Sequence, residues 1–429
     1  MSMKPGLETA SFNLSTKPTK DLFQHVNGGW LDKTEIPEDK AVYGSFYMLA
    51  DDAELAVKEI LEEAAADPKP GVSQQIGELY ASFLDEERIQ KLGAAPLAAD
   101  LEKISSVSNL KELFHLMGQL ERMGVGGLWG SYIDNDPGNP ERYLVHFYNG
   151  GLGLPDKDYY TDEKYQDVKS EYPLHISRMF ELAGVDKSTA NKNAANILAL
   201  ETLIASKHWS RVESRDAEKT YNLKTFEELK KLTPSILWEE YLAGLELTDS
   251  FLEWNVVMMP SFFEGLSEVL TMEHLETLKV WLSWLFIRAH APYLSDDFVA
   301  ERFSFYGTKL TGQPVNRSRW KRAVSLVEGS LGEAVGKIYV EKHFPPSSKT
   351  QMDKLVAHLI EAYRQSIDQL DWMTDETKQK AQTKLQKFTP KIGYPVKWHD
   401  YSSIEIKRED LLQNIKNVSK WDFEYQAKK

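Results

Sequence analysis

The sequence predicts a mainly α-helical fold in two lobes, with a single small β-hairpin. The chain has 429 residues, which is more than one hydrophobic core usually serves, so two lobes are the default expectation. Apolar residues recur at three- and four-residue steps along much of the chain, as they do on the buried faces of helices. One segment instead shows two short β-rich runs around a cluster of turn residues.

The first long helices are predicted between residues 49 and 93. An apolar stripe at helical spacing lies beside an acidic face and consists of Leu49, Ala53, Val57, Ile60, Leu61 and Ala64. After a break at residues 68–70, Ser73 is expected to cap a second helix, which Gly93 would close. The apolar positions of that helix are Ile76, Leu79, Tyr80, Phe83 and Leu84.

The hairpin is predicted near residues 128–148. Two β-rich runs, 128–134 and 142–148, flank a turn-forming sequence at 136–140 that contains two prolines and a glycine. The acidic residues before this turn are spaced as in a calcium loop, but the glycine falls at the fifth position of such a loop. Val145 stands at the twelfth position, where a bidentate glutamate is required. A hairpin turn is therefore the favoured interpretation.

Helical patterns return after Thr220. Residues 275–287 are apolar on nearly every face, which predicts a central buried helix. A long stripe predicts a further packed helix through Met352, Leu355, Val356, Leu359, Tyr363, Ile367 and Leu370. The charged stretch 211–231 contains few core candidates, so we place a lobe boundary near residues 215–235. We expect one portion at 1–225, with the hairpin, and a second helical lobe at 226–429.

Composition excludes several classes of protein. The net charge is -14 and no window holds a basic block, so nucleic-acid and anionic-membrane partners are disfavoured. The chain has no cysteine, which excludes disulfides, thiolate zinc sites and a thiol nucleophile. The first 14 residues lack the pattern of a signal peptide, and the most apolar run, 280–287, is far shorter than a membrane span. We therefore expect a cytoplasmic protein.

The familiar catalytic motifs are missing from the sequence. A helical zinc site needs two histidines four residues apart with a glutamate beside the first, and no two of the ten histidines have this spacing. His274 and His358 are isolated and are interpreted as ordinary helix residues. Ser330 lacks the glycine that a nucleophile elbow requires two positions earlier, and the glycines at 150–153 are not followed by a phosphate-binding lysine. The chain offers no catalytic or metal-binding residues of its own.

Several stretches taken together nevertheless resemble a known family. Their order is Asp21–Trp30, Ile36-Pro37, Tyr43–Phe46, Gly151–Pro155 with Asp158–Tyr160, Tyr221-Asn222, Trp281–Trp284, Trp320, Ala334–Val340, Trp372-Met373 and Ile392–Pro395. Each stretch alone is weak, but their order is specific and covers residues 20 to 400. The sequence resembles the N-terminal part of the neprilysin and endothelin-converting-enzyme family of zinc endopeptidases, especially its bacterial oligopeptidase O branch.

This resemblance implies a helical enzyme whose two lobes enclose a cavity for small peptides. Residues 1–225 would belong to the scaffold of the catalytic lobe, and residues 226–429 would cover the cavity. In the family, two histidines and a glutamate hold zinc, and a second glutamate polarises the attacking water. These residues and the peptide-binding segment lie towards the family's C-terminus, beyond this chain. Zinc is thus expected in the complete enzyme and none in this chain alone.

Three positions correspond to the distal substrate pocket of the family. Charged side chains flank the Tyr-Gly-x-Phe stretch in neprilysin-type members, whereas this sequence has Val42, Tyr47 and Ala50 at the matching positions. We therefore do not expect a preference for a free substrate carboxylate.

The leading hypothesis is the N-terminal part of an oligopeptide-hydrolysing zinc endopeptidase that is inactive alone. The zinc-binding part would come from a complementary C-terminal polypeptide or would have been lost by truncation. The alternative is a non-catalytic peptide-binding or regulatory protein, and an independent hydrolase with an unfamiliar site is a third possibility. The leading hypothesis predicts exposed apolar surfaces where the other part would pack.

Overall fold

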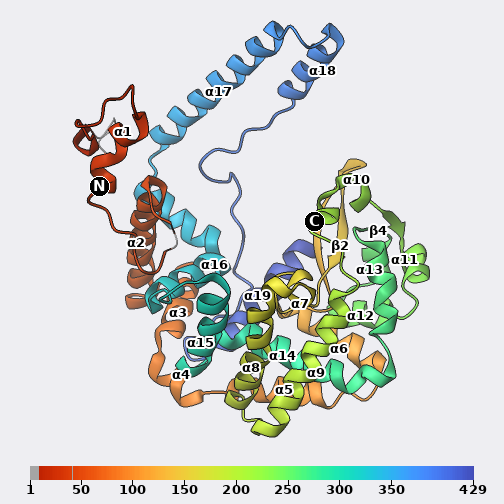
Figure 1. Cartoon of the computed structure of the whole chain (residues 1–429). Coiled ribbons are helices and arrows are strands. Elements are labelled where there is room, and N and C mark those ends of the chain that lie inside the picture. Colours follow the sequence, from red (N-terminus) through yellow and green to blue (C-terminus); the bar gives the residue numbers. More distant parts are fainter. Residues whose placement is uncertain (1–8, 41) are drawn as a thin grey trace.

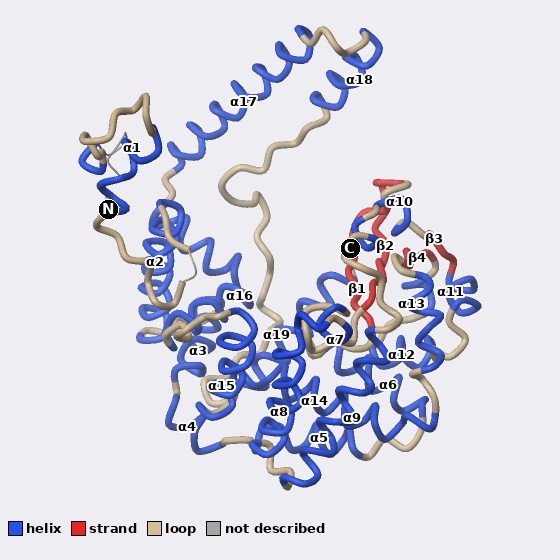
Figure 2. Tube along the Cα trace, viewed as in Figure 1, coloured by secondary structure: helices blue, strands red, loops and turns tan. Residues whose placement is uncertain are grey.

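The computed structural model describes residues 9–40 and 42–429 and is mainly helical, as predicted. These described residues form nineteen α-helices and a four-stranded sheet; most of the helices pack around two hydrophobic cores, and a helical arm projects away from both (Figures 1 and 2). No helix in the described part of the chain combines the length and apolarity needed to cross a bilayer.

The larger core holds the middle of the chain. It is built from residues between Leu97 and Phe305 together with Leu412. Its elements are α5 (Ala98–Ser105), α6 (Leu110–Arg122), β1 (Trp129–Asp136), β2 (Asn139–Asn149), α7 (Asp158–Thr161), α8 (Gln166–Leu182), α9 (Lys187–Ala205), α10 (Ala217–Thr220), β3 (Leu223–Thr225), α11 (Phe226–Leu232), α12 (Trp238–Leu245), β4 (Trp254–Val257), α13 (Pro260–Gly265), α14 (Leu275–His290) and α15 (Asp296–Arg302).

Helix α14 is the buried helix that the sequence predicts. Trp281 and Trp284 are fully buried in it, and both indole N–H groups find acceptors, in Glu201 and Tyr172 respectively. Because apolar side chains point in nearly all directions, the helix must be surrounded by others, and it contacts α5, α8 and α9.

The predicted hairpin is confirmed as strands β1 and β2, which pair in antiparallel register. The sheet order is β1-β2-β4-β3, with β4 parallel to β2 and antiparallel to β3. The hairpin turn is held by the buried Asp136, which accepts hydrogen bonds from the Gly138 amide at 2.8 Å and the Tyr221 hydroxyl at 2.7 Å. Asp136 also forms an ion pair with Arg142, so its carboxylate is used within the hairpin turn.

The smaller core joins segments from both ends of the chain. It contains α2 (Ser45–Ala66), α3 (Val72–Leu84), α4 (Glu86–Leu92), α16 (Arg319–His343) and α19 (Leu411–Ala427). Helices α2 and α3 pack closely because Gly77 has no side chain: a Cβ there would lie 2.2 Å from the backbone oxygen of Ala64. Ser330 lies within α16, in agreement with its interpretation as a helix residue.

The predicted cap of the second helix was wrong. Helix α3 begins at Val72 with Gly71 as its N-cap, so Ser73 lies inside the helix. The helix also stops at Leu84, because the side chain of Asp85 accepts a hydrogen bond from the Arg88 amide and starts α4 as a separate helix. Gly93 does close that helix, at a positive φ of 53° that favours glycine.

The remaining helices lie outside the two cores. Helix α1 (Leu22–Leu31) lies near the N-terminus, and α17 (Pro346–Gln369) and α18 (Asp375–Gln386) form the arm that projects in Figure 1. The stripe predicted on α17 forms one face of a helix, but none of the helix's residues is buried. Its expected packing is absent because, among the described elements, α18 is the main neighbour of α17.

The proposed boundary at residue 225 lies inside the larger core. Strand β3, which ends at Thr225, pairs with β4, and Phe226 and Leu229 just beyond it are buried. The charged stretch 211–231 forms α10, β3 and α11 rather than a linker; a capping box between Thr225 and Glu228 starts α11. The cores therefore divide the chain into a middle part and a second part built from both ends.

Candidate substrate-pocket region

The three pocket candidates lie where a loop enters helix α2. Val42 precedes the helix, and Tyr47 and Ala50 lie three residues apart on one face of its first turns. All three are exposed, Val42 to 52% and Tyr47 to 45%. The structure thus presents one aliphatic, one aromatic and one small side chain to the surroundings, and none of the three carries a charge.

The side chains of Lys40 and Tyr43 hold the loop before α2 against the helix. Lys40 forms an ion pair with Asp51, whose other carboxylate oxygen accepts a hydrogen bond from the Tyr43 hydroxyl at 3.2 Å. The Lys40 ammonium lies 4.9 Å from the centre of the Tyr43 ring and 5.9 Å from that of Tyr47. Tyr43 also stacks on Trp30 of α1. Tyr43 of the Tyr-Gly-x-Phe stretch is therefore a structural anchor.

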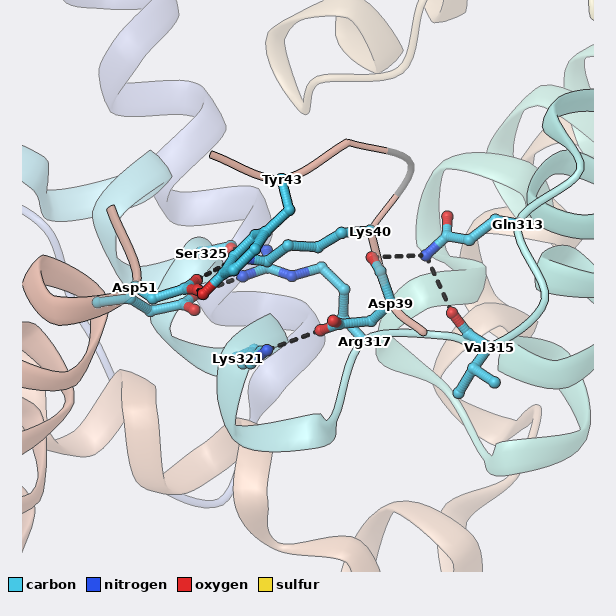
Figure 3. Close-up of polar contacts among 10 residues, drawn as sticks. Asp39, Lys40, Tyr43, Asp51, Gln313, Val315, Arg317, Lys321 and Ser325 are labelled. Atoms are coloured by element: carbon cyan, nitrogen blue, oxygen red, sulfur yellow. Dashed lines mark hydrogen bonds and ion pairs between the residues drawn. The ribbon is translucent and has the colours of Figure 1, made fainter. Parts of the chain in front are cut away.

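A second set of contacts ties the same region to α16 and the loop before it (Figure 3). Lys321 binds Asp39 at 2.6 Å, and this hydrogen bond is the main reason that the pKa of Asp39 is lowered. Arg317 forms an ion pair with Glu54 of α2 and donates to the Ser325 hydroxyl at 2.8 Å.

These contacts determine what the region can recognise. The cations shown in Figure 3, Lys40, Arg317 and Lys321, each bind a carboxylate of the chain itself. A substrate carboxylate would have to displace one of these internal partners and would find no charge on Val42, Tyr47 or Ala50. The arrangement favours contact with apolar or aromatic peptide side chains, which agrees with the sequence-based expectation. That these residues line a substrate pocket stays a prediction.

The described residues do not fit a zinc ion. No group of three or more histidine and carboxylate side chains lies close enough to hold a metal among residues 9–40 and 42–429. His274 lies at the start of α14, where its ring contacts Thr271 and the Val269 carbonyl oxygen. His358 is exposed on α17. We therefore derive no catalytic step from metal-binding residues of this chain.

A buried carboxylate that the sequence analysis missed holds the segment Gly151–Pro155. Glu201 of α9 is fully buried and accepts hydrogen bonds from the hydroxyls of Tyr160 and Tyr172 at 2.7 and 3.2 Å. It also accepts from the Gly153 amide and from the Trp281 indole, each at 3.2 Å. Burial raises the pKa of Glu201, and the hydrogen bonds oppose this effect.

This cluster explains motifs that carry the family resemblance. Gly153 must lack a side chain because a Cβ would lie 1.7 Å from the Tyr172 hydroxyl oxygen. Glu201 is the one charged residue in the apolar stretch 194–205, and that isolation was a signal for a buried polar partner. Because every donor around it is an internal group, we assign Glu201 a structural role.

Comparison with known proteins agrees with this architecture. Residues 18–395 match the model of peptidase family M13. Neprilysin-3 of Drosophila melanogaster is 27% identical over 94% of this chain and 54% of its own length. Human neprilysin is 26% identical over 98% of this chain and 60% of its own length. The chain thus spans little more than half the length of these curated relatives.

Solved structures extend the match to three dimensions. The zinc metalloprotease ZMP1 of Mycobacterium tuberculosis, in complex with an inhibitor, is 42% identical with a TM-score of 0.91, over 98% of this chain and 64% of ZMP1. PEPO from Lactobacillus rhamnosis HN001 is 21% identical with a TM-score of 0.84, over 96% of this chain and 66% of PEPO, and supports the fold alone. The chain belongs to peptidase family M13, the neprilysin-like zinc metallopeptidases.

Proposed function

We propose that this chain is the N-terminal part of a neprilysin-like zinc endopeptidase that hydrolyses oligopeptides when a zinc-binding C-terminal part is joined to it. Membership of family M13 supports the class of reaction. The absence of a metal-binding group among the described residues supports the need for another part. We expect the chain alone to be inactive.

The observation that carries this proposal is the exposed apolar face of α17. Met352, Leu355, Leu359 and Tyr363 follow one another at three- and four-residue steps, so they lie on one side of the helix. Their exposed fractions are 42%, 51%, 51% and 63%. A continuous apolar stripe of this kind is typical of a surface that packs against another polypeptide.

Other large apolar side chains outside the two cores are exposed in the same way. Phe46 at the start of α2 is 83% exposed, Trp372 between α17 and α18 is 71% exposed, and Phe388 beyond α18 is 59% exposed. In Figure 1 the arm projects beyond α2 and α16, away from both cores. We propose that the zinc-binding part packs against the arm and the start of α2 and covers these side chains.

We assign the two roles expected from the family to the two cores. The smaller core, which carries α2 and the candidates Val42, Tyr47 and Ala50, would be the scaffold of the catalytic lobe. The larger core would cover the substrate cavity. This assignment replaces the division at residue 225 with one that follows the cores.

The direct test is reconstitution. The purified chain is mixed with the C-terminal third of ZMP1, or with the product of any downstream reading frame that contains His-Glu-x-x-His, and an internally quenched peptide is added. We expect cleavage in the mixture, loss of cleavage with a zinc chelator, and no cleavage by either part alone.

Two results would contradict the proposal. Cleavage by the isolated chain would support an independent hydrolase. Tight peptide binding by the isolated chain, with neither complex formation nor cleavage in any mixture, would support the non-catalytic peptide-binding alternative. Size-exclusion chromatography of the mixture separates failure to associate from failure to catalyse.

A further inference from the structure

A groove runs between the free edge of the β-sheet and the C-terminal half of α19. Its volume is about 440 Å³, within the range of ligand-binding pockets. Ser131 and Ile133 of β1 line one side, and Asp422, Phe423 and Gln426 of α19 line the other. Figure 1 places the end of α19 beside the hairpin.

Strand β1 offers unpaired peptide groups to this groove. It is an edge strand of the sheet. The carbonyl oxygen of Phe147 accepts a hydrogen bond from the Met258 amide at 2.8 Å, so the peptide groups of Phe147 face β4. Ser131 lies opposite Phe147. Ser131 and Phe147 are therefore a non-hydrogen-bonded pair of the β1–β2 ladder, and the N–H and C=O groups of Ser131 point away from β2, to the free edge. Bonded and non-bonded pairs alternate in an antiparallel ladder, so the groups of Ile133, two residues further along, point the same way.

These outward peptide groups have no partner within the described chain. Outside the β1–β2 ladder, no hydrogen bond within residues 9–40 and 42–429 involves the amide or carbonyl group of Ser131 or Ile133. An unpaired strand edge is a template for one more strand, and addition of an extended peptide to such an edge is a common mode of recognition.

The walls of the groove define the chemistry of its occupant. Apolar side chains from β2 and α12, including Phe147 and Leu245, line it beside two acidic residues, Glu121 and Asp422, and no basic residue. The Glu121 carboxylate accepts hydrogen bonds from the hydroxyls of Tyr241 and Ser131. Burial raises the pKa of Glu121, which favours the neutral carboxyl group. A cation beside it would have the opposite effect and favour the ionised form.

We infer that this groove binds an extended peptide that adds as a strand to β1 and directs a lysine or arginine side chain towards Glu121 and Asp422. The peptide character of the ligand rests on the proposed function, whereas the preference for a basic side chain rests on the groove itself. The site belongs to the larger core, while Val42, Tyr47 and Ala50 lie beside the smaller one. It would hold part of a substrate away from the candidate pocket.

The test uses the full chain and fluorescein-labelled heptapeptides of alternating threonine and valine. One peptide has a central arginine, a second a central glutamate, and a third repeats the first with N-methyl groups on alternate peptide nitrogens. Fluorescence anisotropy gives Kd, and hydrogen–deuterium exchange reports the amides of Ser131 and Ile133. We expect the arginine peptide to bind at least tenfold more tightly than either other peptide and to protect both amides.

A charge variant and its matched control complete the test. Glu121→Gln/Asp422→Asn removes two charges and is expected to raise Kd for the arginine peptide about a hundredfold, since each charged hydrogen bond contributes on the order of a factor of ten. The control Glu376→Gln/Asp371→Asn makes the same charge change on the exposed arm and is expected to bind like the parent chain. If the groove variant does not fold, the N-methylated peptide and the exchange data on the unmodified chain decide the matter.

Equal binding of the arginine and glutamate peptides would overturn the inference, as would unchanged exchange of β1 in the presence of bound peptide. Failure here is distinct from failure of the proposed function. Zinc-dependent cleavage in the reconstituted mixture without protection of β1 would overturn only the groove. Protection of β1 with arginine selectivity would uphold the groove even if no mixture cleaved peptides.

Discussion

Replacing the apolar face of α17 with serine is expected to weaken association with the zinc-binding part about a hundredfold without unfolding the chain. The variant is Leu355→Ser/Leu359→Ser/Tyr363→Ser. Full burial of one such side chain contributes about 1.5–3 kcal/mol, and at each position roughly half of the side chain is exposed and available to a partner. The three positions together therefore contribute about 3 kcal/mol to association, which corresponds to roughly a hundredfold increase in Kd.

The free chain should tolerate these changes because none of the three residues is buried in it. Its free energy of unfolding is expected to fall only by the small helix-propensity cost, about 0.3–0.5 kcal/mol per substitution. Lys354→Ser/Glu361→Ser/Gln365→Ser places the same number of serines on the opposite, polar face of α17 and controls for that cost. Kd comes from titration with the zinc-binding part, and stability from urea unfolding.

Two outcomes would refute the reasoning. If the apolar-face variant associates as tightly as the parent chain, α17 is not the docking surface. If its unfolding free energy falls by more than about 2 kcal/mol relative to the control, the stripe is packed within the chain itself, since truncation of buried side chains has costs of this size.

Three further predictions concern stability and specificity. Burial lowers the pKa of His208 to about 4, so between that value and 6.5 the unfolded state binds a proton that the folded state does not. His208 should therefore contribute about 3 kcal/mol to the loss of stability on acidification through this range, and His208→Gln should reduce the loss by that amount in urea titrations at stepped pH. Gly77→Ala should destabilise the chain by about 1–3 kcal/mol through overpacking. Gly329→Ala, with open space around it, should instead stabilise the chain by up to about 1 kcal/mol. Equal shifts of the two variants in thermal unfolding would show that packing does not distinguish the two positions. In the reconstituted enzyme, Val42→Arg/Ala50→Arg should increase kcat/KM for peptides with a free carboxylate over amidated ones about tenfold, and an unchanged ratio would place these residues outside the pocket.

Local patterns predicted individual elements well. The buried helix α14 follows from a run that is apolar in nearly every direction, and the β1–β2 hairpin follows from its turn residues. The helix α17 was also predicted correctly from its spacing, but its burial was not. Periodicity identifies an apolar face and says nothing of the partner that covers it, so a docking surface and a core face are alike in sequence.

Long-range assembly could not be predicted in the same way. The smaller core brings α2 and α3 against α16, more than 200 residues later, and no local pattern encodes that pairing. The candidate site shows the same limit. Its residues came from a resemblance, whereas the cations that pair with the carboxylates beside them, Arg317 and Lys321, approach from the distant α16 region. Their pairing with Glu54 and Asp39 depends on the fold.

Helix α19 couples the two regions to which we assign peptide recognition. Leu411, Ile415 and Val418 recur at helical spacing and are buried in the smaller core, while the adjacent Leu412 is buried in the larger one. The same helix supplies Asp422 to the groove beside β1. One helix is therefore packed into both cores, so substitutions that loosen the packing of α19 in the smaller core are expected to alter the groove beside β1 as well.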